Sequence, residues 1–339
     1  MEKTKTCIQS YMETGHLNNV AIRIGKNNKV LSEIFVSREK KLSGTTLFDM
    51  ASVTKVMVTA ILCLIAIDEK RITLEDSVSK FFDADEEKQK ITIKNLLTHT
   101  MGIGYKLLHY EGCNYENVQD FVLKIPADVP IGTETLYSCP GYILLGKILE
   151  KVFGKRLDIL FFEKISKPLG MCLTGFCPTK GHDFVNSNPL PEEAGIVNDY
   201  NCRFLGGVAG NAGLFSCMDD VEKYARMLLR FGSPLLYKET FEMATRNYTE
   251  NMQESRTLGF IYVDEKYAQT GKLFSKGSIG HCGHTGQSLF VDLKKGLYVI
   301  ILSDASVSVG KKYGGGHYDI VKKMRENIHN AIQSDLVCM

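Results

Sequence analysis

A long and nearly all-apolar helical pattern occupies residues 51–69, ASVTKVMVTAILCLIAIDE. A helix that is apolar on every side has no face for solvent, so we expect it at the centre of the protein. Its most apolar part, residues 56–67, is shorter than the ~20 residues needed to cross a bilayer, which indicates a buried helix. Ser52 and Lys55 stand at its start.

Strand patterns lie on both sides of this helix in the sequence, near the two ends of the chain. Residues 18–37 alternate apolar and polar around Gly25-Lys26-Asn27-Asn28, which predicts a hairpin. Alternation returns at residues 258–263, 288–293 and 297–302, the last two joined by a short Lys-Lys-Gly turn. Helical patterns open and close the chain (residues 1–15 and 318–333) and fill its middle (92–97, 118–123, 141–153, 157–165 and 219–231).

This order of elements predicts an α+β protein. We expect an antiparallel β-sheet flanked by the N- and C-terminal helices, with an inserted all-helical domain. The sheet domain would comprise residues 1–67 and 255–339, and the mainly helical insertion residues 68–254.

Composition excludes several classes of protein. The 339 residues are 44% hydrophobic and 24% charged with a formal net charge of +2, so the chain lacks the basic field that nucleic-acid binding requires. The ten cysteines form no CxxC and no zinc-like spacing with histidine, which favours reduced thiols. The N-terminus has no apolar signal segment. We therefore expect a cytoplasmic location, no membrane partner and no metal.

The spacing Ser-x-x-Lys occurs four times, at Ser37/Lys40, Ser52/Lys55, Ser77/Lys80 and Ser308/Lys311. Only Ser52 opens a long buried helix, where residues three apart share a face and the Lys55 amine reaches the serine hydroxyl. The helix N-terminus favours an alkoxide, and burial favours a neutral amine that accepts the serine proton. Spacing alone favours a serine that caps a helix beside a surface lysine, and the apolar neighbours Val53, Val56 and Met57 bring the catalytic interpretation level with it.

Two further segments carry residues suited to catalysis. Tyr137 stands in a turn before an apolar helix, where cationic neighbours would let it carry a proton, although a buried structural tyrosine is the commoner case. Residues 283–288, GHTGQS, precede a strand, so the backbone N–H of Gln287 is available to an oxyanion unless the segment is only a turn.

Taken in order, these segments resemble the penicillin-recognising serine hydrolases: class C β-lactamases, D,D-carboxypeptidases, D-aminopeptidases and related esterases. The similar stretches are LFDMASVTKV (47–56), ITIKNLLTHTMGI (91–103), LYSCPGYILLGKILEKVFG (136–154), PLGM (168–171), GGVAGNAGLFS (206–216) and GHTG (283–286). The resemblance implies a sheet domain and a helical domain with the site at their junction. It implies Ser52 as nucleophile, Lys55 and Tyr137 as proton carriers, and the N–H groups of Ser52 and Gln287 as oxyanion hole.

The chain departs from the β-lactamase pattern at two of its substrate-binding positions. Cys139 replaces the asparagine of Tyr-x-Asn, and a thiol does not substitute for a carboxamide. His284 replaces the lysine of Lys-Thr-Gly, before Thr285 and Gly286, and a histidine is mostly neutral near pH 7. Both changes favour an esterase or amidase over an efficient β-lactamase.

The predicted activity is therefore cleavage of a small ester, amide or peptide through an acyl-enzyme on Ser52, with no cofactor. A class C-type β-lactamase, a D-Ala carboxypeptidase or a D-aminopeptidase is the alternative within enzymes. A non-catalytic binding module is the alternative outside them. GxSxG is absent, which disfavours an α/β-hydrolase, and Cys282 beside His281 has no mark of a nucleophile. We expect the pocket walls to come from loops at about 104–116, 178–200 and 304–317, which set the substrate; the oligomeric state is open.

Overall fold

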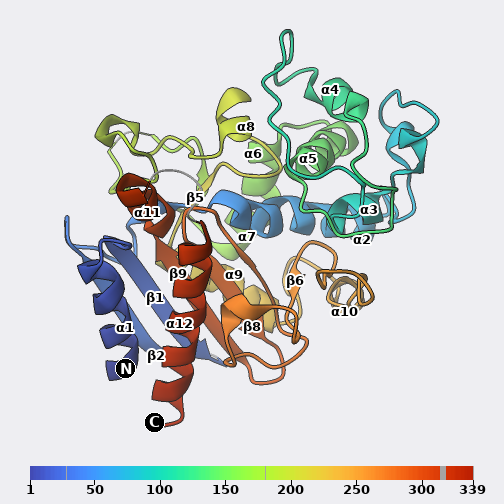
Figure 1. Ribbon diagram of the computed structural model, residues 1–339. Coiled ribbons are helices and arrows are strands. Elements are labelled where there is room, and N and C mark those ends of the chain that lie inside the picture. Colours follow the sequence, from blue (N-terminus) through green and yellow to red (C-terminus); the bar gives the residue numbers. More distant parts are fainter. Residues whose placement is uncertain (28, 180, 314–317, 339) are drawn as a thin grey trace.

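A six-stranded antiparallel sheet forms one side of the molecule in the computed structural model, which describes residues 1–27, 29–179, 181–313 and 318–338. Its strand order is β2-β1-β9-β8-β7-β6, so strands from both ends of the chain lie side by side (Figure 1). The central strands are buried along nearly their whole length because helices cover both faces. The strands are β1 (Asn19–Lys26), β2 (Lys29–Ser37), β6 (Ile261–Tyr262), β7 (Ile279–Cys282), β8 (Ser288–Asp292) and β9 (Leu297–Ser303).

The terminal helices cover one face of this sheet. α1 (Glu2–Glu13) and α12 (Tyr318–Leu336) pack on each other, and their apolar residues join those of β1 and β9 in one hydrophobic cluster (Figure 1). α11 (Ala305–Tyr313) packs beside α12. The opposite face is covered by α9 (Met218–Leu229), which contacts β1, β8 and β9. The terminal helices and the antiparallel sheet thus confirm the predicted fold class.

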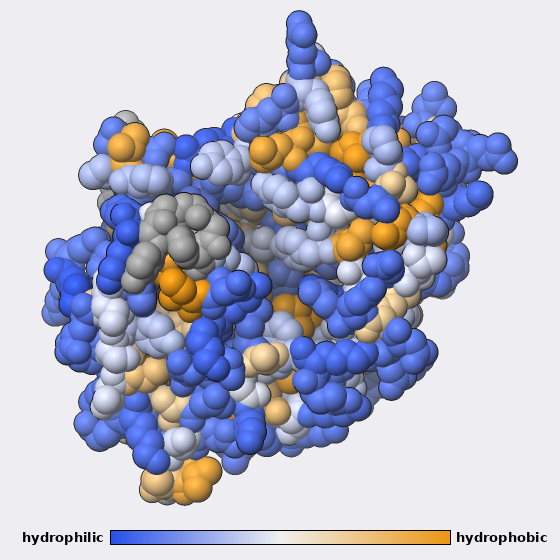
Figure 2. Space-filling model, viewed as in Figure 1, coloured by the Kyte–Doolittle hydropathy of each residue, from blue (hydrophilic) through white to orange (hydrophobic). Residues whose placement is uncertain are grey.

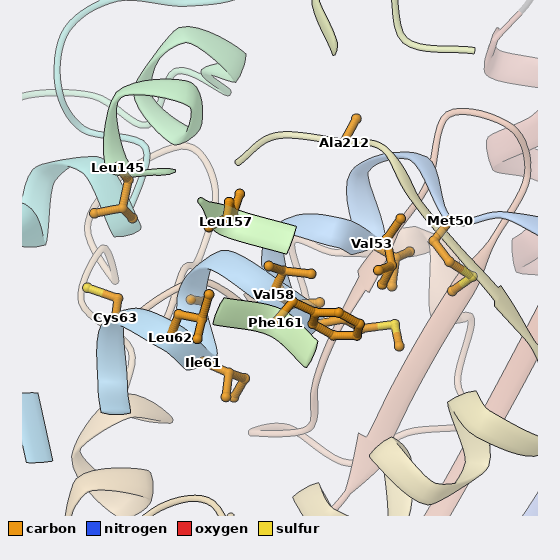
Figure 3. Close-up of a cluster of buried hydrophobic side chains, with 14 of the residues drawn as sticks. Met50, Val53, Val58, Ile61, Leu62, Cys63, Leu145, Leu157, Phe161 and Ala212 are labelled. Carbon is orange, nitrogen blue, oxygen red and sulfur yellow. The ribbon is translucent and has the colours of Figure 1, made fainter. Parts of the chain in front are cut away.

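The apolar segment expected at the centre of the protein is buried there. It runs through η1 (Ala51–Val53) and η2 (Lys55–Ala60), which are 3-10 and π-helical, into α2 (Ile61–Asp68). Its side chains pack with Leu145, Leu157 and Phe161 (Figure 3). Residues 51–68 are apolar enough to pass for a membrane span by composition, but 83% of that window is buried inside the fold.

Helices of the middle of the chain surround this central segment (Figure 1). They are α3 (Ile93–Leu97), α4 (Val118–Lys124), α5 (Cys139–Phe153), α6 (Leu157–Phe161), η5 (Phe162–Ser166), α7 (Lys167–Leu169), α8 (Tyr200–Phe204) and α10 (Lys238–Ala244), with short 3-10 turns η3 (Val78–Lys80), η4 (Lys88–Lys90) and η6 (Pro191–Glu193). The 3-10 turn η7 (Ala268–Thr270) packs on α12 instead. A small sheet of order β3-β5-β4, made of Leu47–Asp49, Leu214–Cys217 and Gly175–Phe176, leads directly into the central segment.

Several sequence predictions differ in detail from the structure. The strand expected at 258–263 is limited to β6, and the expected loop at 304–317 contains α11; residues 314–317 and Asn28 of the first hairpin turn lie outside the described residues. The domain boundaries stay a prediction, but α9 lies within the expected insertion 68–254 and nevertheless packs on the large sheet. That helix is amphipathic, and the sheet offers its apolar stripe a complementary face.

Candidate active site

The turn that carries Ser52 holds an unusual backbone conformation. Ala51 has φ of 45°, the left-handed region that a residue with a Cβ seldom occupies. The buried carboxylate of Asp49 supports it, because Oδ1 accepts the Ala51 N–H at 2.8 Å and Oδ2 accepts the Asn198 N–H at 2.7 Å. Burial raises the pKa of Asp49 to about 6. A buried carboxyl group and a strained backbone residue therefore fix the position of Ser52.

The hydroxyl of Ser52 contacts two proton-carrying side chains. Lys55 Nζ donates to Ser52 Oγ at 3.1 Å, and Tyr137 donates its phenolic hydrogen to the same oxygen at 2.7 Å. Lys55 and Ser52 come from consecutive turns of the central segment, whereas Tyr137 comes from the turn before α5. The structure thus brings together the three residues that were predicted from the sequence to carry out acyl transfer.

Lys55 is completely buried, and its amine is held by neutral groups. Nζ donates to the backbone carbonyl of Asn211 at 2.9 Å and to Cys139 Sγ at 3.6 Å. It also lies 4.8 Å from the centre of the Tyr137 ring. Within the described residues no carboxylate forms an ion pair with this amine. Sequence reasoning missed Asn211, although the segment that contains it, residues 206–216, was recognised as a family signature.

Tyr137 is a phenol in the resting site. Burial, and next the neighbouring Cys139, raise the pKa of Tyr137 well above its usual range, while the Arg256 guanidinium opposes that shift. A stabilised phenolate was the predicted condition for proton transfer by Tyr137; here Tyr137 is instead a donor to Ser52 Oγ, so it does not accept the serine proton in this arrangement. The cause is the enclosure of the ring, 4.7 Å from the centre of the His99 imidazole.

Cys139 occupies the position of the asparagine in Tyr-x-Asn, at the start of α5. Its neighbour Ser138 caps that helix by accepting the Gly141 N–H at 3.0 Å. The Cys139 side chain is buried against Lys55, and burial raises the pKa of its thiol. Its predicted part in binding substrate stays a prediction, since the contact that it makes in this structure is with the lysine.

The GHTG segment contacts the residues that precede Ser52. A Cβ on Gly283 would come within 2.8 Å of the Met50 carbonyl, and Gly286, with φ of 121°, would meet Ser303 Oγ. Thr285 is fully buried, and its hydroxyl lies 3.2 Å from the Asp49 carbonyl. These contacts fix the segment beside Ser52; the predicted substrate contacts of Thr285 and Gly286 remain predictions.

His284 is the member of that segment whose side chain is exposed. Its ring stacks on Tyr318 at 5.1 Å between centres, and Nε2 lies 3.2 Å from Ser306 Oγ. Desolvation by these neighbours, and second the Arg325 guanidinium, lower the pKa of His284. The ring is therefore neutral near pH 7 and does not supply the positive charge of a lysine at this position.

Two backbone N–H groups are available for an oxyanion. Within the described residues, neither the Ser52 N–H nor the Gln287 N–H has a backbone acceptor outside regular helices and strands. The Gln287 side chain is buried and donates from Nε2 to the Ser303 carbonyl at 3.1 Å, which fixes the backbone around it. Such fixed donors are the requirement for stabilising a tetrahedral intermediate.

The described part of the chain contains no cluster of three or more His, Cys, Asp or Glu side chains with metal-binding geometry. Figure 2 shows that the viewed face is hollowed between the helical region and the sheet region, with polar side chains around the depression. The junction of these two regions is also where η1 meets β7.

A model of the beta-lactamase family matches residues 4–316 of this sequence. The chain belongs to the beta-lactamase family. It is accordingly a serine hydrolase, and the beta-lactamase fold explains why the two ends of the chain build a single sheet.

Relatives within this family carry different activities in their names. The N-acetylmuramyl-L-alanine amidase of Bacillus subtilis (strain 168) is 26% identical over 322 residues, which cover 83% of this chain and 73% of the amidase. The solved structure of EstCE1, described as a hydrolase with promiscuous acyltransferase activity, has a TM-score of 0.75 at 19% identity, covering 97% of this chain and 98% of its own. The octameric penicillin-binding protein homologue from Pyrococcus abyssi has a TM-score of 0.73 at 22% identity, and the match covers 92% of this chain and 77% of that homologue. The two structures share the fold.

Proposed function

We propose that this enzyme cleaves a small ester or amide through an acyl-enzyme on Ser52. The observation that carries the proposal is the pair of contacts on one oxygen: Lys55 Nζ at 3.1 Å and Tyr137 O–H at 2.7 Å from Ser52 Oγ. A serine used only as a helix cap has no need of a buried lysine and a half-buried tyrosine on its hydroxyl. This arrangement also disfavours the alternative of a non-catalytic binding module.

The acylation step follows from these contacts. Acylation requires the deprotonated form of Lys55, in which a lone pair replaces the hydrogen that Nζ donates to Ser52 Oγ in this structure. This amine accepts the Ser52 proton while Oγ bonds to the substrate carbonyl carbon, and the N–H groups of Ser52 and Gln287 bind the oxyanion. Tyr137 then gives its proton to the leaving alcohol or amine as the carbonyl–leaving-group bond breaks. The Lys55 ammonium returns a proton to the Tyr137 oxygen. Water attacks the acyl-enzyme by the same transfers in reverse, so no cofactor is needed.

The substrate range follows from the departures at Cys139 and His284. Because His284 is neutral near pH 7, the site lacks the cation that attracts the carboxylate of a β-lactam at this position. Cys139 offers no carboxamide to a substrate amide. We propose ester cleavage with slow β-lactam turnover, and the amidase named among the relatives supports amide substrates as well.

A fluorophosphonate probe on the intact protein tests the catalytic assignment. We expect labelling of the wild type, no labelling of Ser52→Ala, and full labelling of Ser77→Ala, a control with the same Ser-x-x-Lys spacing on a surface turn. Unlabelled wild type, or labelled Ser52→Ala, contradicts the proposal. Rates with p-nitrophenyl acetate, a chromogenic cephalosporin and D-alanyl peptides then rank the substrate classes; fast cephalosporin hydrolysis contradicts the proposed preference.

We further propose a cytoplasmic location, supported by ten cysteines that are all free thiols in this fold. Fractionation of cells that express the native chain tests it, and recovery in a secreted or membrane fraction contradicts it.

A further inference from the structure

Arg256 is a buried cation near Tyr137 that has no part in the proposed acylation step. Its side chain is 7% exposed, and its guanidinium carbon lies 5.9 Å from the centre of the Tyr137 ring. Two of its nitrogens, Nε and Nη1, are buried without a hydrogen-bond acceptor in the described residues. Burying an arginine with unpaired N–H groups costs folding free energy, so a charge at this place calls for a functional reason.

The charge of Arg256 is only weakly compensated. Its Nη2 pairs with Glu254, but the Glu254 side chain is 53% exposed, and solvent screens a carboxylate in that position. The guanidinium therefore keeps an uncompensated positive field on the side that faces Tyr137 and the protein interior. Arg256 also lines an open cavity of about 370 Å³ on its outer side.

The backbone around Arg256 fixes the guanidinium relative to the tyrosine. The Arg256 N–H donates to Thr249 Oγ1 at 2.8 Å. The Glu254 N–H donates to Thr135 Oγ1 at 3.0 Å, which joins this loop to the segment two residues before Tyr137. The cation and the tyrosine are thus held by one network of contacts.

The other titratable groups around the Tyr137 ring do not provide a cation of this kind. His99 from the end of α3 and His281 from β7 lie 4.7 and 6.3 Å from the ring centre, and burial lowers the pKa of both well below the usual range, so both are neutral. Burial raises the pKa of the Cys139 thiol, which therefore stays protonated and uncharged. Lys55, at 4.8 Å, is the first positive charge once it has accepted the serine proton.

We propose that Arg256 is a positioning residue of the acyl-transfer reaction, whose guanidinium supplies the second positive charge beside Tyr137 and stabilises the phenolate formed when Tyr137 protonates the leaving group. The inference rests on the proposed function. It concerns one step: the O–H bond of Tyr137 breaks, its electron pair stays on the phenolic oxygen, and the proton joins the departing oxygen or nitrogen.

The leaving group determines how strongly the reaction rate depends on this proton transfer. A p-nitrophenolate departs without a proton, whereas an alkoxide or an amine needs one. We expect Arg256→Met to lower kcat/KM about tenfold or more for an ethyl ester and an alkyl amide, with p-nitrophenyl acetate changed by less than about threefold. Arg256→Lys should recover most of the loss, because it keeps the charge. Arg246→Met, at an exposed site outside the active centre, is the matched control and should leave all three rates unchanged.

Other outcomes overturn the inference. Equal losses for all leaving groups, with a lower thermal midpoint, assign Arg256 a structural role. A higher KM at unchanged kcat for esters that carry a carboxylate, with neutral esters unaffected, assigns Arg256 to anion binding from the cavity that it lines. Activity of the wild type with no difference in either Arg256 variant contradicts only this inference, whereas failure of the Ser52 labelling experiment contradicts the proposed function itself.

Discussion

Thr285 places its hydroxyl 3.2 Å from the backbone carbonyl of Asp49 and so connects the turn after β7 to the strand that leads into Ser52. The same hydroxyl contacts the side-chain oxygen of Gln287, whose N–H is one half of the proposed oxyanion hole. A single buried side chain therefore contacts both the strand before Ser52 and the side chain of Gln287. Since Asp49 also supports the strained Ala51, this one contact connects both halves of the catalytic geometry.

Thr285→Val tests that connection. Valine keeps the shape but removes the donor, so we expect a loss of about 1–2 kcal/mol in the free energy of unfolding. A drop in kcat should accompany it as the Gln287 N–H loses alignment. Urea unfolding and steady-state kinetics measure the two effects. Thr285→Ser should restore kcat; a valine variant with wild-type kcat argues against the role of this contact.

Lys55→Met is expected to abolish the activation of Ser52. The methionine fills most of the buried space, but the acceptor for the serine proton is gone, so kcat/KM should fall by roughly 10²–10⁴. Stopped assays with p-nitrophenyl acetate measure it. Lys80→Met is the matched control, because Lys80 has the same spacing from a serine but pairs with Asp76 on the surface. Comparable losses in both variants contradict the assignment.

Cys139→Asn is expected to shift the enzyme towards β-lactams. The carboxamide can accept from Lys55 and donate to a substrate carbonyl, neither of which a buried thiol does well. One added hydrogen bond to the bound substrate is worth about 1 kcal/mol, so cephalosporin turnover should rise by roughly fivefold or more relative to ester cleavage. Cys139→Ser, which adds no carboxamide, should not show this shift. An unchanged ratio of rates in the asparagine variant rejects the explanation given for slow β-lactam turnover.

His329 predicts acid sensitivity of the fold. Burial lowers the pKa of His329 to about 4 from its usual 6.5. Between these two values the unfolded chain binds a proton that the folded chain does not, so stability falls as pH drops through this window, by up to about 3 kcal/mol for this residue. Unfolding curves at pH 7 and pH 4.5 measure the difference. His329→Gln should flatten the pH dependence, whereas the exposed His182→Gln should not; equal slopes in all three proteins contradict the prediction.

The sequence by itself predicted many of the elements and a candidate nucleophile. Alternation and turn residues gave both hairpins, β1–β2 and β8–β9, because strand periodicity and turn chemistry are local. The burial of residues 51–68 followed from their uniformly apolar character. Ser52 and Lys55 were found because they lie three residues apart on one helix, and the order of the motifs located Tyr137 and GHTG.

Only the tertiary structure decided how these residues work. Asn211 and Arg256 reach Lys55 and Tyr137 from 156 and 119 positions away, and no local pattern marks either contact. The protonation of Tyr137 depends on its enclosure by groups from separate elements. Thr285 contacts Asp49 because the GHTG turn lies against the end of β3. Desolvation and buried charge are properties of the assembled interior, so they arise only when segments distant in the chain come together.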